Sequence, residues 1–121
     1  MLEPATPATQ PRSITDEVIE AGNLLLNLGN YRLQVDGRPV DLTYHEFDLL
    51  RLLAERLDHV VGFRDLARAL WQADGHREVR RLNVLAFRLR AKLTDSWPYR
   101  IETIRGRGYG LVKAIEGASR G

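Results

Sequence analysis

Two stretches of the chain alternate between apolar and polar residues, which is the pattern of β-strands. In residues 23–42, Leu33 and Val35 alternate with polar neighbours, and Asp36-Gly37 next to them is a typical hairpin turn. Near the C-terminus, strands are expected over residues 99–104 and 109–113, joined by the turn Arg105-Gly106-Arg107-Gly108. Glycines at such a turn permit the positive φ angles of a tight tip. The pattern predicts an antiparallel meander followed, much later, by a β-hairpin.

Between these stretches, apolar residues recur every three or four positions, as on one face of an α-helix. A first helix is expected to begin at Thr43, which can form a capping box with Glu46, and to end near residue 57. A second, short helix is expected over residues 63–70 and a third over residues 78–93. The order of elements is therefore strands, three helices and a hairpin.

The third helix has two different sides when its residues are spaced by about 100° each. One side is apolar and is expected to face the core: Val79, Leu82, Ala86, Leu89 and Leu93. The opposite side is expected to face outward: Arg80, Arg81, Val84, Phe87, Arg88 and Ala91. Asn83 and Arg90 fall on one flank and Leu85 on the other. The sequence has no acidic residue between Arg80 and Lys92, whereas solvated helix faces usually carry both signs of charge.

Basic residues are concentrated toward the end of the chain. The 121 residues carry a formal net charge of +2. Residues 1–76 hold seven basic and twelve acidic residues, but residues 77–113 hold ten basic and three acidic ones. This change of sign within a chain of one domain's length predicts one basic face, the usual footprint of a polyanionic partner. Charge alone is equally compatible with a solvated charged helix.

Several classes of protein are excluded or disfavoured. The chain has no cysteine, which excludes disulfides and cysteine-ligated zinc, and its three histidines lack metal-ligand spacing. No nucleophile–base set is apparent. The sequence has no apolar run long enough to span a membrane and no signal peptide. We therefore expect a cytoplasmic, non-enzymatic protein that needs no metal, no cofactor and no membrane.

The chain is divided here into one domain and two tails. Residues 1–22 are interpreted as a flexible linker or tail, because they hold three prolines among small and polar residues. Residues 23–114 are expected to form one α+β domain, and residues 115–121 a C-terminal tail.

Four motifs follow one another along the chain: Leu42-Thr43-x-x-Glu46-Phe47-x-Leu49-Leu50; Val60-Val61 with Leu66 and Trp71; Arg80-x-x-x-Val84-x-x-x-Arg88-Leu89-Arg90-x-Lys92-Leu93; and Ile101-x-Thr103-Ile104-Arg105-Gly106-x-Gly108-Tyr109-Gly110. With these motifs and this order of elements, residues 23–113 resemble the winged helix-turn-helix DNA-binding domain of OmpR/PhoB-type bacterial response regulators. The resemblance implies an N-terminal antiparallel β-sheet, three helices and a C-terminal hairpin, the wing.

The same resemblance implies sequence-specific binding of double-stranded DNA in transcription regulation, with the third helix in the major groove and the wing at the minor groove. The implied DNA-contacting residues are Arg80, Arg81, Val84, Phe87, Arg88, Arg90, Thr103, Arg105, Arg107 and Tyr109. The chain departs from the family pattern at Gly62-Phe63, Asn83 and Leu85, where the family usually has Ser-Arg, Asp and His. Because two of these are reading positions, the target sequence is not implied.

The resemblance also bears on partners. Family members often bind direct repeats as head-to-tail pairs, so the isolated domain is expected to be a monomer. Residues 71–78 match a loop that contacts RNA polymerase in some members. Response regulators carry a receiver domain, which residues 1–22 are too short to form, so the chain is either an excised effector domain or a free-standing regulator. The alternative hypothesis is a winged helix that binds a protein through Val84 and Phe87 and does not read DNA.

Overall fold

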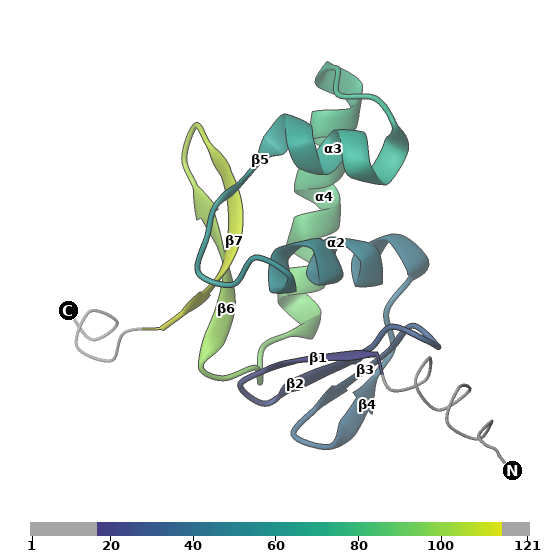
Figure 1. Ribbon diagram of the computed structural model, residues 1–121. Coiled ribbons are helices and arrows are strands. Elements are labelled where there is room, and N and C mark those ends of the chain that lie inside the picture. The colour runs from purple at the N-terminus through teal and green to yellow at the C-terminus, as the bar shows by residue number, and fades with distance from the viewer. Residues whose placement is uncertain (1–16, 115–121) are drawn as a thin grey trace, which may run out of the picture.

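The computed structural model describes residues 17–114 of the chain, which form two β-sheets and three helices (Figure 1). The elements follow in the order β1 (Val18–Ala21), β2 (Leu24–Asn27), β3 (Arg32–Val35), β4 (Arg38–Val40), α2 (Tyr44–Ala54), β5 (Val61–Gly62), α3 (Phe63–Trp71), α4 (His76–Lys92), β6 (Tyr99–Ile104) and β7 (Gly108–Lys113). The predicted order of an N-terminal sheet, three helices and a C-terminal hairpin is confirmed.

The N-terminal sheet is an antiparallel meander in the order β1-β2-β3-β4. Asp36 and Gly37 both have positive φ, 55° and 78°, as the primed turn of a tight hairpin requires. The predicted tail over residues 1–22 is too long, because residues 18–21 form β1 and Ala21 is buried. Only one residue of this edge strand is fully buried, so its sequence shows no apolar alternation. The rest of that tail and residues 115–121 lie outside the described residues.

Helix α2 begins with the predicted capping box. The Thr43 hydroxyl accepts a hydrogen bond from the Glu46 N–H at 3.2 Å, and the Glu46 carboxylate accepts one from the Thr43 N–H at 2.9 Å. The helix ends at Ala54, three residues before the expected position. The chain then reaches a left-handed conformation at Asp58, where φ is 65° and the N–H donates to the Leu111 carbonyl of β7 at 3.0 Å. The wing strand therefore fixes the loop after α2.

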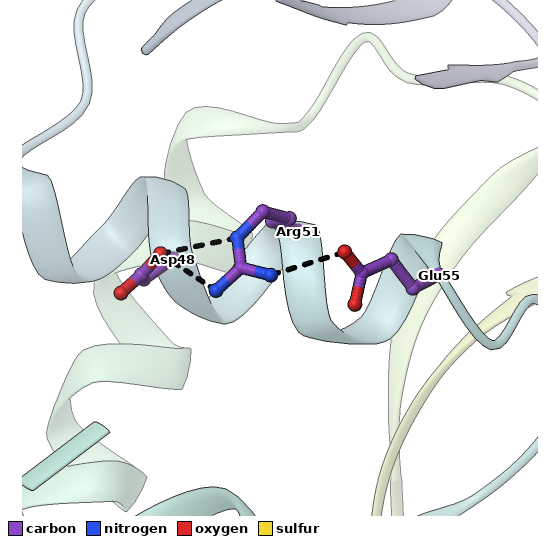
Figure 2. Close-up of polar contacts among 3 residues, drawn as sticks. All are labelled: Asp48, Arg51 and Glu55. Atoms are coloured by element: carbon purple, nitrogen blue, oxygen red, sulfur yellow. Dashed lines mark hydrogen bonds and ion pairs between the residues drawn. The ribbon is translucent and has the colours of Figure 1, made fainter. Parts of the chain in front are cut away.

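The surface of α2 carries a short chain of ion pairs (Figure 2). Arg51 donates from Nε and Nη2 to one oxygen of Asp48, at 3.2 and 3.1 Å, and from Nη1 to Glu55 at 3.0 Å. Pairs spaced by three and four residues stabilise a helix by about 0.2–0.5 kcal/mol each. They support α2, whose other side packs against α3 and α4.

The core lies where the three helices meet the two sheets. Its largest fully buried side chains come from every layer: Phe47, Leu24, Leu26, Leu33, Leu49, Leu50, Leu53, Leu66, Leu82, Leu89 and Leu111. Helix α4 is the longest helix and runs past both α2 and α3 (Figure 1). Its position is therefore fixed by packing along most of its length.

The C-terminal hairpin is part of a three-stranded antiparallel sheet in the order β5-β7-β6. At the tip, Gly106 has a φ of 75°, as predicted for a tight turn. Gly108 has a different role, because a Cβ atom at this position would lie 1.9 Å from the Val61 carbonyl oxygen. A glycine there lets β7 approach β5, and so attaches the hairpin to the start of α3.

Candidate nucleic-acid interface

The outer face of α4 is basic with an apolar centre. Arg80, Arg81 and Arg88 are exposed, as predicted. Between them, Phe87 is 70% exposed and Val84 is 49% exposed. The opposite side is buried, through Leu82, Ala86 and Leu89 among others. Burial of one side fixes which side chains of α4 face outward.

The structure corrects three details of the predicted α4. The helix begins at His76, two residues earlier than expected, because Glu78 accepts a hydrogen bond from the Gly75 N–H at 3.1 Å and so caps its first turn. Leu85, which the helical wheel placed on a flank, is buried, while Val79 is only half-buried. Because the helix packs against both α2 and α3, its buried side is shifted toward Leu85 and away from Val79 relative to the predicted apolar side.

A groove of about 540 Å³ lies between the outer face of α4, the start of α2 and the end of α3. It is lined by Thr43, His45, Trp71, Arg77, Arg80, Arg81, Val84, Leu85 and Arg88. The guanidinium carbon of Arg81 lies 5.0 Å from the centre of the Trp71 ring, a cation–π contact. The indole Nε1 of Trp71 is buried and has no hydrogen-bond partner within residues 17–114.

Trp71 is a candidate functional residue that the sequence did not reveal. A buried N–H without a partner is rare in folded proteins, and an external acceptor such as a phosphate oxygen would satisfy it. In the sequence, Trp71 follows the apolar pattern of a helix end and has no feature that separates it from an ordinary core aromatic residue. Its position beside Arg81 became evident only in the structure.

The wing presents its basic residues at its tip. Arg105 and Arg107 lie in the exposed turn between β6 and β7. The Arg107 carbonyl accepts a hydrogen bond from the Phe63 N–H at 3.1 Å, at the first residue of α3. Figure 1 shows this tip beside β5 and the start of α3. The tip is thus attached to the helical part of the domain on the same side as the start of α4.

Two side-chain links join the wing to α4. Arg90 donates from Nε to the Ile101 carbonyl at 3.2 Å and from Nη2 to the Thr103 hydroxyl at 2.8 Å. The Tyr109 hydroxyl donates to Oδ1 of Asn83 at 2.7 Å. Arg90 and Thr103 remain exposed, but each is engaged with the other. The two flanking residues of α4 therefore hold the hairpin in a fixed position relative to the helix.

Tyr109, which the resemblance implies as a DNA-contacting residue, is buried in the structure. It is only 4% exposed, and its ring packs edge-on against Phe63 with centroids 5.4 Å apart. Burial raises the pKa of its hydroxyl, although the charge of Arg90 opposes this. Tyr109 lies directly opposite Thr103 on the paired strand, so the two side chains project from the same face of the hairpin. Both side chains form hydrogen bonds with residues of α4. In the structure, Tyr109 links the wing to α4 through Asn83.

The five arginines at α4 and the wing tip share an electrostatic property. Arg80, Arg81, Arg88, Arg105 and Arg107 make no ion pair with any residue in the range 17–114, a property they share with most arginines of that range but not with Arg51 and Arg68. What distinguishes the five is that they lie on one helix and one hairpin tip that are linked to each other. Unneutralised arginines gathered on one side produce a positive potential that attracts polyanions.

Among the described residues, no group of His, Asp and Glu is arranged to hold a metal ion, and no helix is long and apolar enough to cross a membrane.

Comparisons with known proteins identify the family. Residues 37–111 match the family model described as "Transcriptional regulatory protein, C terminal". The chain is 37% identical over 92 residues to the two-component response regulator PhoP of Pseudomonas aeruginosa, and the match covers 75% of this chain and 41% of that protein. It is 34% identical over 98 residues to the sensory transduction protein RegX3 of Mycolicibacterium smegmatis, covering 79% and 43%. The chain thus spans about two fifths of the length of these relatives.

Solved structures agree with this assignment. The DNA-binding domain of CpxR from E. coli superposes with a TM-score of 0.74 at 32% identity, over 83% of this chain and all of that domain. The RstA DNA-binding domain of Klebsiella pneumoniae, solved in complex with the RstA box, superposes with a TM-score of 0.72 at 31% identity, over 79% and 97%. The chain therefore belongs to the family of C-terminal, DNA-binding domains of OmpR/PhoB-type transcriptional regulators.

Proposed function

We propose that this chain binds double-stranded DNA at specific sequences and regulates transcription as the effector domain of a response regulator. The observation that carries this proposal is the surface formed by α4 and the wing tip, where five exposed arginines have no ion-pair partner within residues 17–114. Two links between α4 and the wing hold these arginines in one rigid arrangement. A preorganised basic surface of this kind suits the regular phosphate spacing of a duplex.

The groups have separate tasks in the proposed complex. Helix α4 enters the major groove, where Arg88 and Arg80 read base edges, since arginine pairs in bidentate fashion with guanine. Arg105 reaches the minor groove, where negative potential attracts arginine, and Arg107 and Thr103 support it at the backbone. Arg90 holds the wing instead of reading a base, because its guanidinium is already engaged with Ile101 and Thr103.

We propose that Trp71 and Arg81 together bind one backbone phosphate. The ring of Trp71 lies under the Arg81 guanidinium and leaves the edge of that group free to donate. The indole N–H has no partner among the described residues but is closed off from solvent, so it becomes a second donor when the side chains that cover it shift to admit the phosphate. Two donors on one phosphate fix the position of the duplex along α4 without reading its sequence.

The wider assembly follows the family. We propose that two copies bind direct repeats head to tail, that the isolated domain is a monomer acting in the cytoplasm without enzymatic activity, and that in a longer protein a receiver domain precedes it. The relatives of which this chain spans two fifths are described as response regulators, which supports this.

The turn between α3 and α4, within residues 71–78, is the candidate contact for RNA polymerase. In this turn Asp74 pairs with Arg68, which lowers the pKa of the Asp74 carboxyl and stabilises the turn.

The experiment that tests this function is selection of duplexes from a random pool with the purified chain. We expect enrichment of a short direct repeat that the chain binds with strong salt dependence. Failure to bind any duplex at low salt would overturn the proposal. In that case the winged helix would act as a protein-binding module, and capture of a partner that resists salt and requires Phe87 would identify it.

A further inference from the structure

We propose that His45 of α2 is a third donor of the phosphate site at Trp71 and Arg81, and that the domain therefore takes up a proton when it binds DNA. This inference rests on the proposed DNA-binding function. It adds a ligand from an element other than α4 and the wing, and with it a dependence of affinity on pH. The site holds one phosphate of the duplex backbone and reads no base.

His45 reaches the groove through its contact with Trp71. It is the second residue of α2, and its side chain is half-buried. The centre of its imidazole lies 5.5 Å from the centre of the Trp71 ring, and 5.4 Å from that of Tyr44, which stands edge-on to it. The guanidinium carbon of Arg81 lies 5.0 Å from the centre of the same Trp71 ring. Trp71 thus brings an imidazole from one helix and a guanidinium from another to a single indole.

The groove around this indole is suited to an anion. Four of its lining residues are arginines of α4: Arg77, Arg80, Arg81 and Arg88. No carboxylate is among the residues that line it. Arginine keeps its charge throughout the pH range in which proteins function. The groove therefore attracts a phosphate through a fixed positive charge, to which His45 adds one that depends on pH.

In the described part of the chain, the carboxylates next to His45 on its own helix already have partners. Glu46 pairs with Lys92 at 2.7 Å, and Asp48, one turn further along α2, pairs with Arg51 at 3.1 Å. The charged groups that face the imidazole from α4 are all arginines. A backbone phosphate in the groove is therefore the counter-charge that a protonated His45 would find.

Histidine is the side chain whose charge responds to a phosphate near neutral pH. It ordinarily gains or loses its proton between about pH 5 and pH 8. A phosphate beside the ring favours the protonated form, in which both ring nitrogens donate hydrogen bonds. The DNA-bound domain therefore holds more protons than the free domain. Because the coupling between proton and DNA is reciprocal, affinity for DNA rises as the pH falls through this range.

The test measures Kd for the selected duplex by fluorescence anisotropy at constant salt, from about pH 8 down to about pH 5.5. We expect the unchanged chain to bind about fivefold to tenfold more tightly at the lower pH, because a neutral hydrogen bond becomes a charge-assisted one. His45→Gln, which keeps an N–H donor but does not titrate, should remove this gain. The chain has three histidines, and His59→Gln and His76→Gln are the matched controls that should retain it.

A second series replaces single phosphates of the duplex by uncharged methylphosphonate. At one position per bound domain, the unchanged chain should lose its pH dependence, and His45→Gln should then cost no further affinity. If His45 only supported the packing of Trp71, His45→Gln would lower affinity equally at both pH values and for every phosphate position. A thermal scan of each variant at both pH values verifies that it is folded.

The outcomes separate this inference from the proposed function. If no duplex is bound at any pH, both fail. If the duplex is bound but its affinity does not change with pH, or if His45→Gln keeps the full change, the inference is overturned while DNA binding stands. Loss of the pH dependence in His76→Gln instead of His45→Gln would also overturn it, because His76 lies beside Gly106 and Arg107 of the wing tip and does not line the groove at Trp71.

Discussion

At the scale of single residues, Glu46 joins the two helices on which the interface depends. It is only 2% exposed, yet its carboxylate accepts from the Thr43 N–H and from Lys92 Nζ, at 2.9 and 2.7 Å. Lys92 also donates to the Asp41 carbonyl at 3.1 Å. Burial by itself would raise the pKa of Glu46, but the hydrogen bonds from Lys92 and Thr43 and the charge of Lys92 together lower it. One carboxylate thus links the start of α2 to the end of α4.

The lowered pKa predicts how stability depends on pH. A carboxyl whose pKa is lower in the folded chain stabilises it above the ordinary value for glutamate, about 4.3, and this contribution is lost as the pH falls through the folded-state pKa. Because Lys92 is partly exposed, we expect Glu46→Gln to cost only about 1–2 kcal/mol at neutral pH. Urea unfolding across a pH series should show this difference shrink in acid.

Glu55→Gln is the matched control, since Glu55 is an exposed member of a pair on the same helix. It should change the unfolding free energy much less than Glu46→Gln. A cost for Glu46→Gln that stays constant from neutral to acid pH would show that the charge of Glu46 contributes nothing to stability.

Arg88 permits a second prediction at this scale. Arg88→Ala should weaken binding to the selected duplex by about 1–3 kcal/mol and relax selection at one base pair, because a bidentate contact to guanine is lost. Arg38→Ala, a change of an exposed arginine on β4, is the control and should leave selection unaltered. Repeating the selection with both variants measures this directly. Unchanged specificity with Arg88→Ala would mean that this face of α4 does not read bases.

At the scale of elements, the wing and α4 form one rigid unit through Arg90 and the Asn83–Tyr109 link. We therefore expect the effects of Arg90 and Arg105 on DNA affinity to be coupled. In an Arg90→Met background, where the stem remains but the link is lost, Arg105→Ala should cost about 0.5–1 kcal/mol less than in the unchanged chain.

The matched cycle uses Arg80→Ala in the same Arg90→Met background. Arg80 lies on α4 and not on the wing, so its effect should be nearly additive with the loss of Arg90. Full additivity between Arg90 and Arg105, measured by fluorescence anisotropy, would instead indicate that Arg90 contacts DNA independently of the wing.

Elements were predicted from the sequence where one local signal determines them. The capping box at Thr43, the Asp36-Gly37 turn and the apolar side of α4 each depend on residues a few positions apart. The missed features depend on residues far apart. β1 exists because it pairs with β2, Leu85 is buried on a helix that packs against two others, and Gly108 is required by the Val61 carbonyl.

The same distinction applies to the candidate interface. The arginines of α4 and the wing tip were predicted and are exposed, since a charged residue outside the apolar stripe has few alternatives to solvent. The partner of each side chain was not predictable from the sequence. Tyr109 turned inward to Asn83, and Trp71 came to lie beneath Arg81, because β7 and α3 pack against α4 in three dimensions.

At the scale of the whole molecule, acidic residues predominate in residues 1–76 and basic residues in residues 77–113, and the fold places these two parts in different elements. The acidic first part of the chain builds the whole N-terminal sheet, α2 and α3, where acidic residues outnumber basic ones and two of the arginines, Arg51 and Arg68, pair with neighbouring carboxylates. The basic last part builds α4 and the wing, where basic residues outnumber acidic ones and the arginines make no ion pair among residues 17–114. One side of the domain therefore carries a concentrated positive field.

The salt dependence of DNA binding tests this central claim most directly. The selected duplex, carrying a fluorescent label, is titrated with the chain at a series of salt concentrations, and anisotropy gives Kd at each. With about six to eight phosphates contacted, we expect the logarithm of the association constant to fall with the logarithm of salt at a slope of roughly −5 to −7. A slope near zero, with binding that persists at high salt, would contradict a phosphate-contacting basic face and favour an apolar protein interface at Phe87.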